Sequence, residues 1–328
     1  MQNNDTNATA ASTSEQRSIR ERVGLAIFGS DAPSTVAAIS AAESAGVRQI
    51  WTTQVPTTPD ALTVFAAATV QTAQIRLGTS IVPTYPRHPL TLAQQALALN
   101  DLGSGRLRLG IGPSHRPTIE GVYGIPMTAP LEHLREYVTV LRKLLWEGSV
   151  DYRGRFYTVK STLPRTPQTP ILISALREGA FHLAGEIADG AISWVCPVPY
   201  LLNKALPALR SGAASAGRAV PPLVAHVPIA LSEDRQAILA AARQQLGRYG
   251  KLPFYASMFA DAGFPVAADG TLSDALIENL VVLGNENAVA AQLASLLAQG
   301  LDELLIMPIT VARPAEELGQ LTRLIGKL

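Results

Sequence analysis

Short apolar runs alternate with amphipathic segments along the chain from residue 22 onward. Runs that are apolar throughout are typical of strands buried on both faces. We expect eight such strands, at residues 23–28, 49–53, 75–82, 107–111, 171–174, 191–195, 223–231 and 304–308. Helices are expected between them, the first with Ser34 as its N-cap, and the alternation indicates a parallel sheet covered by helices.

Eight strand–helix units in 328 residues favour a (β/α)8 TIM barrel with insertions. The alternative is a doubly wound open sheet, which usually carries a glycine fingerprint after its first strand. Gly24 and Gly29 do not form that fingerprint, so the barrel is the preferred prediction.

Glycines mark three of the joints at which a helix ends and the next strand begins. Gly46, Gly190 and Gly300 stand at these joints, and each is expected to adopt a left-handed conformation there. Two units are much longer than the others, at residues 112–170 and 232–302. Insertions of this length usually carry lids or binding loops, so we expect the substrate to contact them.

Residues 1–20 are rich in Asn, Thr, Ser and Ala and contain no apolar period, which predicts a disordered arm before a single domain at residues 21–328. The net charge of +1 gives no electrostatic footprint for nucleic acid. The lone Cys196 excludes a disulfide framework, and no apolar run is long enough to span a membrane. We therefore expect a cytoplasmic protein that binds small molecules rather than nucleic acid or membranes.

Catalytic residues of a barrel lie at the C-terminal ends of its strands. These ends carry hydroxyls, amides, arginines and two histidines, but hardly any carboxylates and no G-x-S-x-G motif. The histidines also lack metal-ligand spacing; they are His88, His115, His133, His182 and His226. A site without its own nucleophile, acid pair or metal suggests that a bound organic cofactor supplies the chemistry.

Two strand ends are candidate anion sites. Ser114 and His115 follow a Gly-x-Gly-Pro turn whose N–H groups can converge on a phosphate. Residues 174–177 lie where the fifth strand turns into a helix N-terminus. The alternative is that Ser174 only caps this helix and that Arg177 is a solvated charge. His88 is likewise either a loop-stabilising residue before a helix or a functional one.

The segment LGTSIVPTYPRHPLTLAQQALALNDLGSGRLRLGIGPSH, at residues 77–115, resembles the bacterial luciferase-like superfamily. It is most similar to the branch of oxidoreductases that use the deazaflavin coenzyme F420. The resemblance continues through ILISALRE and LAGEIADGAISW, and covers nearly everything from Val23 onward. It implies a (β/α)8 barrel that binds a flavin or deazaflavin at its C-terminal mouth. It also implies a homodimer.

The resemblance implies a non-prolyl cis peptide between Ser80 and Ile81, behind the cofactor ring. Thr53 and Gln54 would lie near the polar edge of that ring. The phosphate and its linker would lie against Ser114, His115 and the turn at residues 174–177. The full set of implied cofactor-binding residues is Thr53, Gln54, Thr79, Ser80, Ile81, His88, Gly112, Ser114, His115, Ser174, Ala175, Leu176, Arg177 and Trp194.

The choice of cofactor depends on charge at the mouth. Coenzyme F420 carries a phosphate and a polyglutamate tail, whereas FMN carries one phosphate. The basic residues expected there favour the deazaflavin, with FMN as the alternative; they are Arg87, His88, His115, Arg116 and Arg177.

The implied reaction is hydride transfer to an activated C=C or C=N bond of a small organic substrate. Related alcohol and sugar-phosphate dehydrogenases carry an Asp-His pair where this chain has Gln54 and Val55, so alcohol oxidation is disfavoured. His115, which stands where those enzymes have a Glu, is the candidate catalytic residue, with solvent as the alternative proton source. The alternatives to a reductase are an FMN-dependent monooxygenase and a non-catalytic barrel that binds the cofactor.

Overall fold

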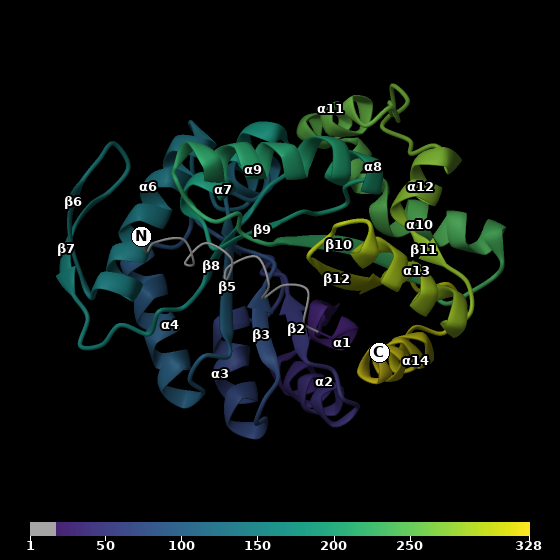
Figure 1. Ribbon diagram of the computed structural model, residues 1–328, viewed down its shortest axis with the longest axis horizontal. Coiled ribbons are helices and arrows are strands. Elements are labelled where there is room, and N and C mark those ends of the chain that lie inside the picture. Colours follow the sequence, from purple (N-terminus) through teal and green to yellow (C-terminus); the bar gives the residue numbers. More distant parts are fainter. Residues whose placement is uncertain (1–17) are drawn as a thin grey trace, which may run out of the picture.

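Eight parallel strands close into a barrel in the computed structural model, which describes residues 18–328 (Figure 1). The strands are β1 (Val23–Ala26), β2 (Gln49–Thr52), β3 (Arg76–Thr79), β5 (Leu107–Gly112), β8 (Ile171–Ser174), β9 (Gly190–Ile192), β10 (Leu223–Ala230) and β12 (Glu303–Pro308). Their order around the barrel is β10-β12-β1-β2-β3-β5-β8-β9, and pairing of β9 with β10 closes it. The predicted (β/α)8 TIM barrel is confirmed.

The third predicted strand is divided in two. β3 ends at Thr79, and β4 (Val82–Pro83) pairs separately with the end of β5. Residues 80 and 81 between them leave the ladder, which makes a bulge at the mouth of the barrel.

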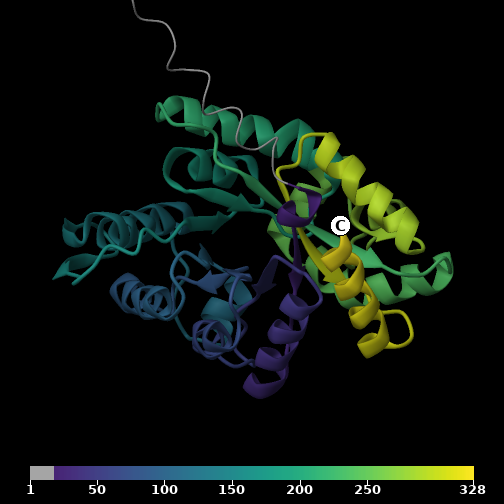
Figure 2. The same ribbon diagram turned by 60° about the horizontal axis from the view of Figure 1, so that its bottom comes forward.

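Helices surround the barrel, as Figure 2 shows. Their buried apolar side chains form one core with those of the strands. The helices that follow barrel strands are α2 (Ala32–Ser44), α3 (Ala61–Gln71), α4 (Pro89–Leu102), α6 (Pro130–Arg142), α7 (Glu178–Ile187), α9 (Leu206–Ser215), α13 (Glu286–Ala298) and α14 (Pro314–Lys327). None of the helices within residues 18–328 is long and apolar enough to cross a membrane.

The start of α2 differs from the prediction. Its N-cap is Asp31 rather than Ser34, because the Asp31 carboxylate accepts hydrogen bonds from both the backbone N–H and the hydroxyl of Ser34 at 2.8 Å. The helix is therefore capped by the Asp31 carboxylate, and not by the Ser34 hydroxyl as predicted.

Two of the three predicted glycine joints are confirmed. Gly46 and Gly300 have φ values of +96° and +109°, the left-handed region that glycine enters without steric cost. Gly190 was predicted wrongly, since it is the first residue of β9 and is absent from the positive-φ glycines. Here α7 ends directly into extended backbone at Ala188.

The predicted N-terminal arm lies mostly outside the described residues, which begin at Ser18. The short helix α1 (Ile19–Arg22) precedes β1, and the domain boundary stays a prediction. The Arg22 guanidinium donates to the carbonyl oxygens of Leu301 and Asp302, both at 2.7 Å. These bonds fix α1 to the segment that enters β12.

The two long units carry additional elements. After β5 come α5 (Arg116–Gly121), α6, the π-helical turn η1 (Lys143–Glu147) and a hairpin of β6 (Ser149–Arg153) and β7 (Thr158–Thr162) that projects from the barrel (Figure 1). After β10 come α10 (Arg235–Gly250), α11 (Pro253–Asp261), α12 (Asp274–Leu280) and β11 (Val282–Leu283). Between β9 and α9 lie α8 (Val198–Tyr200) and η2 (Leu201–Ala205).

Candidate functional site

The floor of the barrel mouth is formed by inward-facing residues at the strand ends. The barrel interior is filled by Ala26, Trp51, Leu172, Ile192, Val224 and Leu305. Ile81, Trp194 and Met307 pack on this cluster and are only partly buried. Two more residues, Ser174 and His226, stand two positions after Leu172 and Val224 of this cluster, so alternation along the strands turns their side chains to the interior as well. This floor is the candidate site.

The bulge after β3 is held by the end of β2. The Ser80–Ile81 peptide is cis, as the resemblance implied. The Thr53 hydroxyl donates to the Ser80 carbonyl oxygen at 2.8 Å, and the backbone N–H of Gln54 donates to the Ile81 carbonyl oxygen at 3.3 Å. These bonds place the Ile81 side chain against the interior cluster.

Thr79 and the Gln54 side chain support the bulge from behind. Thr79 is fully buried, and its hydroxyl donates to the Gly110 carbonyl oxygen at 2.7 Å. The Gln54 side-chain oxygen accepts from the Ala61 N–H at 2.7 Å, at the start of α3. The Thr79 hydroxyl and the Gln54 side-chain oxygen are therefore hydrogen-bonded within the protein, and the part of both residues in cofactor binding stays a prediction.

Gly112 allows β5 and β8 to approach closely at the mouth. A Cβ atom at this position would lie 2.0 Å from the Ser174 hydroxyl oxygen. Ser174 itself ends β8 and is not the cap of α7, whose N-cap residue is Arg177. The alternative prediction for Ser174 is thus wrong, and its hydroxyl lies beside the Gly112 backbone.

The predicted anion site after β8 keeps part of its donors. The Ala175 N–H is already used, because it donates to the Ile192 carbonyl oxygen at 2.9 Å. The N–H groups of Leu176 and Arg177 have no acceptor among residues 18–328 and precede the ten-residue helix α7. The Arg177 guanidinium forms an ion pair with Asp261 of α11 at 3.0 Å. The turn therefore offers an anion two free backbone N–H groups and no unpaired guanidinium, which is fewer donors than predicted.

The mouth is also less basic than predicted. Besides the Arg177 pair, Arg87 forms an ion pair with Asp60, and Arg116 forms one with Glu120. Burial acts to raise the pKa of Asp60, but its hydrogen bonds with Arg87 and Thr63 outweigh this and lower it. Each of the three arginines thus faces a carboxylate.

His88 has the structural role that was one of its two predictions. It is the N-cap residue of α4, its Nδ1 accepts from the Leu90 N–H at 3.2 Å, and Pro89 occupies the first turn. Its ring also meets Tyr157 of the hairpin edge-on, with 5.6 Å between ring centroids.

His115 lies half-buried between β5 and the insertion after β10. Its ring meets Tyr255 and Tyr249 edge-on at centroid distances of 5.7 and 6.2 Å. Burial lowers the pKa of His115, and the charge of Arg248 lowers it further, so the imidazole is neutral near neutral pH. Ser114 before it has a φ of +63°, which turns the chain sharply at the end of β5.

Trp194 is fixed by His226, which the sequence analysis did not assign to the site, and by Tyr249 of the insertion at residues 232–302, which it expected to contact the substrate. Its ring stacks on His226 with 3.8 Å between centroids, and its Nε1 donates to the Tyr249 hydroxyl oxygen at 2.6 Å. His226 accepts from the Val195 N–H through Nδ1, and burial lowers its pKa to about 3. The sequence could have placed His226 in the barrel interior, because it stands two positions after the inward-facing Val224 on the same strand.

His133, on α6, has a packing role. It is buried and stacks on Tyr85 with 3.9 Å between ring centroids and 2° between planes. Its Nε2 lies 2.8 Å from the Tyr157 hydroxyl, which joins α6 to the hairpin. Burial lowers the pKa of His133 to about 4, against the opposing charge of Glu136.

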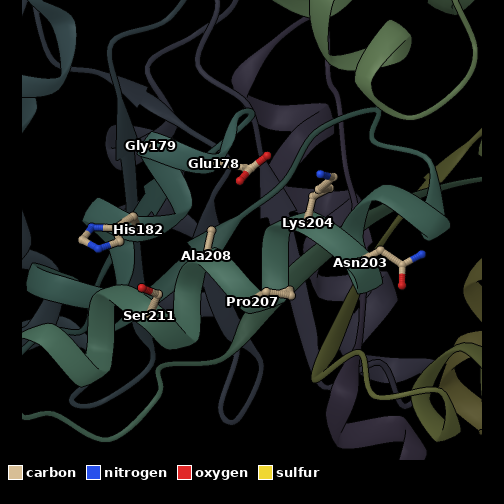
Figure 3. Close-up of a pocket in the computed structure, with 8 residues that line it drawn as sticks. All are labelled: Glu178, Gly179, His182, Asn203, Lys204, Pro207, Ala208 and Ser211. Atoms are coloured by element: carbon tan, nitrogen blue, oxygen red, sulfur yellow. The ribbon is translucent and has the colours of Figure 1, made fainter.

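A groove of about 510 Å³ on the outer surface, between α7 and the η2–α9 segment, is separate from the mouth (Figure 3). It is lined by Glu178, Gly179, His182, Asn203, Lys204, Pro207, Ala208 and Ser211. None of these residues belongs to the end of a barrel strand, so the groove is not the candidate site.

Two solved structures share this fold over nearly the whole chain. A coenzyme F420-dependent tetrahydromethanopterin reductase from Methanopyrus kandleri aligns with a TM-score of 0.73 and 21% identity, covering 93% of this chain and 97% of its own. The oxygenating constituent of 3,6-diketocamphane monooxygenase from Pseudomonas putida, in complex with FMN, aligns at 0.70 and 17%, covering 93% and 96%.

Relatives in sequence extend the comparison. An uncharacterised protein of Mycobacterium tuberculosis is 28% identical over 281 residues, which cover 76% of this chain and 82% of the relative. A putative coenzyme F420-dependent oxidoreductase of the same organism is 26% identical over 349 residues, covering 92% and 97%. The family model of luciferase-like monooxygenases matches residues 8–303. The chain therefore belongs to the luciferase-like monooxygenase family.

Proposed function

We propose that this protein is a coenzyme F420-dependent oxidoreductase that reduces an activated C=C or C=N bond of a small organic substrate. The observation that carries the proposal is the chemistry of the mouth floor. Ile81, Trp194 and Met307 are apolar, and His226 is buried and neutral. The nearby Cys196 is buried, which raises the pKa of its thiol to about 12 and makes it a poor nucleophile. Redox chemistry here requires a cofactor.

The mouth fits a planar ring with an anionic arm. The apolar surfaces of Ile81 and Trp194 suit one face of a ring, and the free N–H groups of Leu176 and Arg177 suit a phosphate. The relative with the F420-dependent description supports a deazaflavin as this ring. When bound, the deazaflavin supplies a hydride from ring C5.

The protein's own part in the reaction is positioning and proton supply. Gln54 and Val55 offer no acid or base after β2, which argues against alcohol oxidation. His115 is partly exposed at the mouth, and we assign it as the catalytic residue that passes a proton to the substrate after hydride transfer. Because its imidazole is neutral at neutral pH, one ring nitrogen can donate its proton to the substrate while the other nitrogen accepts a proton from solvent.

An FMN-dependent monooxygenase is the second candidate. The ion pairs of Arg87, Arg116 and Arg177 leave less free positive charge for a glutamate tail than the sequence predicted. An FMN-bound monooxygenase also shares the fold. One phosphate with its planar ring would satisfy the same apolar floor and N–H groups.

A single-turnover experiment separates these candidates. The purified protein is mixed anaerobically with reduced coenzyme F420 and a set of enones and imines, and the return of oxidised-coenzyme absorbance is followed. We expect acceptor-dependent oxidation that falls at least about tenfold in His115→Gln. Oxygen consumption and substrate oxygenation with reduced FMN alone would contradict the proposal. Binding of the deazaflavin without any turnover would indicate a non-catalytic binding barrel.

We also propose that the protein is a homodimer, as the resemblance implies. Sedimentation velocity of the purified protein tests it, and a monomer at working concentration would contradict it.

A further inference from the structure

We propose that Arg248 and Tyr249 form a subsite for the carboxylate group of the substrate, at the edge of the mouth next to Trp194. The inference deepens the proposed function, on which it rests, because it assigns a substrate class: unsaturated acceptors that carry a carboxylate. The subsite lies at the C-terminal end of α10, in the insertion after β10.

The Tyr249 hydroxyl is already saturated as an acceptor but not as a donor. Its oxygen accepts from Trp194 Nε1 at 2.6 Å and from Arg248 Nη2 at 3.0 Å. A phenol oxygen has two lone pairs and one hydrogen. No acceptor for that hydrogen exists among residues 18–328, so it is free to be donated to a ligand.

Arg248 is the mouth arginine without a carboxylate partner in the described part of the chain. Arg87, Arg116 and Arg177 each form an ion pair with an acidic side chain, but none of the described ion pairs includes Arg248. Its side chain is exposed, and its Cζ lies 5.0 Å from the centroid of the Tyr249 ring. The contact with the phenol therefore orients the guanidinium while leaving its other N–H groups accessible.

The chemistry of these groups selects an oxyanion. The guanidinium contributes charge and several N–H donors, and the phenol contributes one O–H donor. The two oxygens of a planar carboxylate match such a pair of neighbouring donors. Because Tyr249 also holds the Trp194 indole, a carboxylate bound here places the rest of its molecule over the mouth floor.

The glutamate tail of coenzyme F420 carries the same carboxylate chemistry. We assign the subsite to the substrate because Tyr249 bonds to Trp194, at the floor that would receive the ring. The free N–H groups of Leu176 and Arg177, where the phosphate is expected, lie at the turn after β8 instead.

The first test uses the purified full-length protein without cofactor. Crotonate is titrated against its uncharged counterpart crotonamide, and binding is followed by tryptophan fluorescence, with Trp194→Phe identifying the reporting side chain. We expect Arg248→Gln to weaken crotonate binding at least about tenfold and Tyr249→Phe about threefold or more. Crotonamide binding stays unchanged. The matched control is Arg116→Gln, which removes a paired mouth arginine and leaves crotonate affinity as in the wild type.

Equal crotonate affinity in wild type and Arg248→Gln, or no saturable crotonate binding to the wild type, would overturn the proposal. Circular dichroism checks that the variants are folded. A second titration compares coenzyme F420 with the tail-less deazaflavin. If Arg248→Gln binds coenzyme F420 more weakly but binds the tail-less deazaflavin as the wild type does, Arg248 contacts the glutamate tail. That result would overturn the substrate subsite. If FMN binds and the deazaflavin does not, the proposed function fails while the crotonate result still decides the subsite.

Discussion

The Trp194 indole donates a hydrogen bond of 2.6 Å to the hydroxyl oxygen of Tyr249, 55 residues further along the chain. The bond joins the end of β9 to the end of α10. Tyr249 is only 4% exposed, so the insertion packs firmly against the barrel at this point. The position of Trp194 in the mouth thus depends on a segment outside the strand that carries it.

Removal of this acceptor is expected to destabilise the protein. Tyr249→Phe leaves the indole N–H and one guanidinium N–H without their partner, which typically costs about 1–3 kcal/mol. Urea unfolding followed by circular dichroism measures the free energy of unfolding. The control is Tyr123→Phe, since the Tyr123 hydroxyl has no hydrogen bond within residues 18–328. Equal stability of Tyr249→Phe and the control would show that the bond contributes nothing.

Stability is expected to fall in mild acid because two histidines are buried in the neutral form. Burial lowers the pKa of His226 to about 3 and that of His133 to about 4. In the unfolded chain histidine titrates near about 6.5, so between these values the unfolded state binds more protons. The free energy of unfolding then decreases with falling pH by up to about 1.4 kcal/mol per pH unit for each histidine, and is insensitive to both above about pH 7.

Urea unfolding of His226→Gln at about pH 7.5 and about pH 5 tests this. The variant keeps an acceptor for the Val195 N–H, and the decrease between the two pH values should be clearly smaller than in the wild type. His182→Gln, at a partly exposed position on α7, should keep the full decrease. An unchanged decrease in His226→Gln would contradict the assignment.

Close packing of β5 on β8 predicts a steric effect at Gly112. The added methyl of Gly112→Ala would lie 2.0 Å from the Ser174 hydroxyl oxygen, so we expect a loss of about 1–3 kcal/mol of stability. The second substitution Ser174→Ala removes that oxygen and should restore part of the loss. Gly121→Ala, with no atom within 4 Å of the added Cβ, is the control. Additive effects of the two substitutions in thermal unfolding would refute direct contact.

The Arg177–Asp261 ion pair is expected to compete with cofactor binding. Both side chains are about half exposed, and exposed pairs contribute about 0–1 kcal/mol. Asp261→Asn frees the guanidinium for a phosphate and should tighten coenzyme F420 binding by up to about fivefold. Asp151→Asn, which breaks an exposed pair with Lys160 on the hairpin, should have no effect. Weaker binding to Asp261→Asn would show that the pair supports the site instead.

Much of the barrel is readable from the sequence because its strands are apolar throughout and its helices separate them. The apolar pattern predicted the strand at residues 171–174 with its correct bounds. The resemblance predicted the cis peptide in the bulge after Thr79. The errors concern the ends of helices and strands. The N-cap of α2 is Asp31 rather than Ser34, and Gly190 is the first residue of β9 rather than a left-handed joint before it. Caps and joints depend on one or two residues, so periodicity does not resolve them.

The partners of the charged residues could not be predicted. Arg87 meets Asp60 from 27 residues away, and Arg177 meets Asp261 from 84 residues away. The first pair joins two neighbouring loops at the barrel mouth, and the second joins the turn after β8 to the insertion after β10; no local pattern contains either contact. Three of the arginines predicted to make the mouth basic are therefore ion-paired, and of these pairs only Arg116 with Glu120, at i,i+4 spacing, could be read from the sequence.

The most direct test of the account is an equilibrium titration of the purified protein with coenzyme F420 and, in parallel, with FMN, followed by the fluorescence of each ligand. We predict saturable binding of one deazaflavin per chain, at least about tenfold tighter than FMN. FMN retained at one per chain through purification, with no binding of the deazaflavin, would contradict the account.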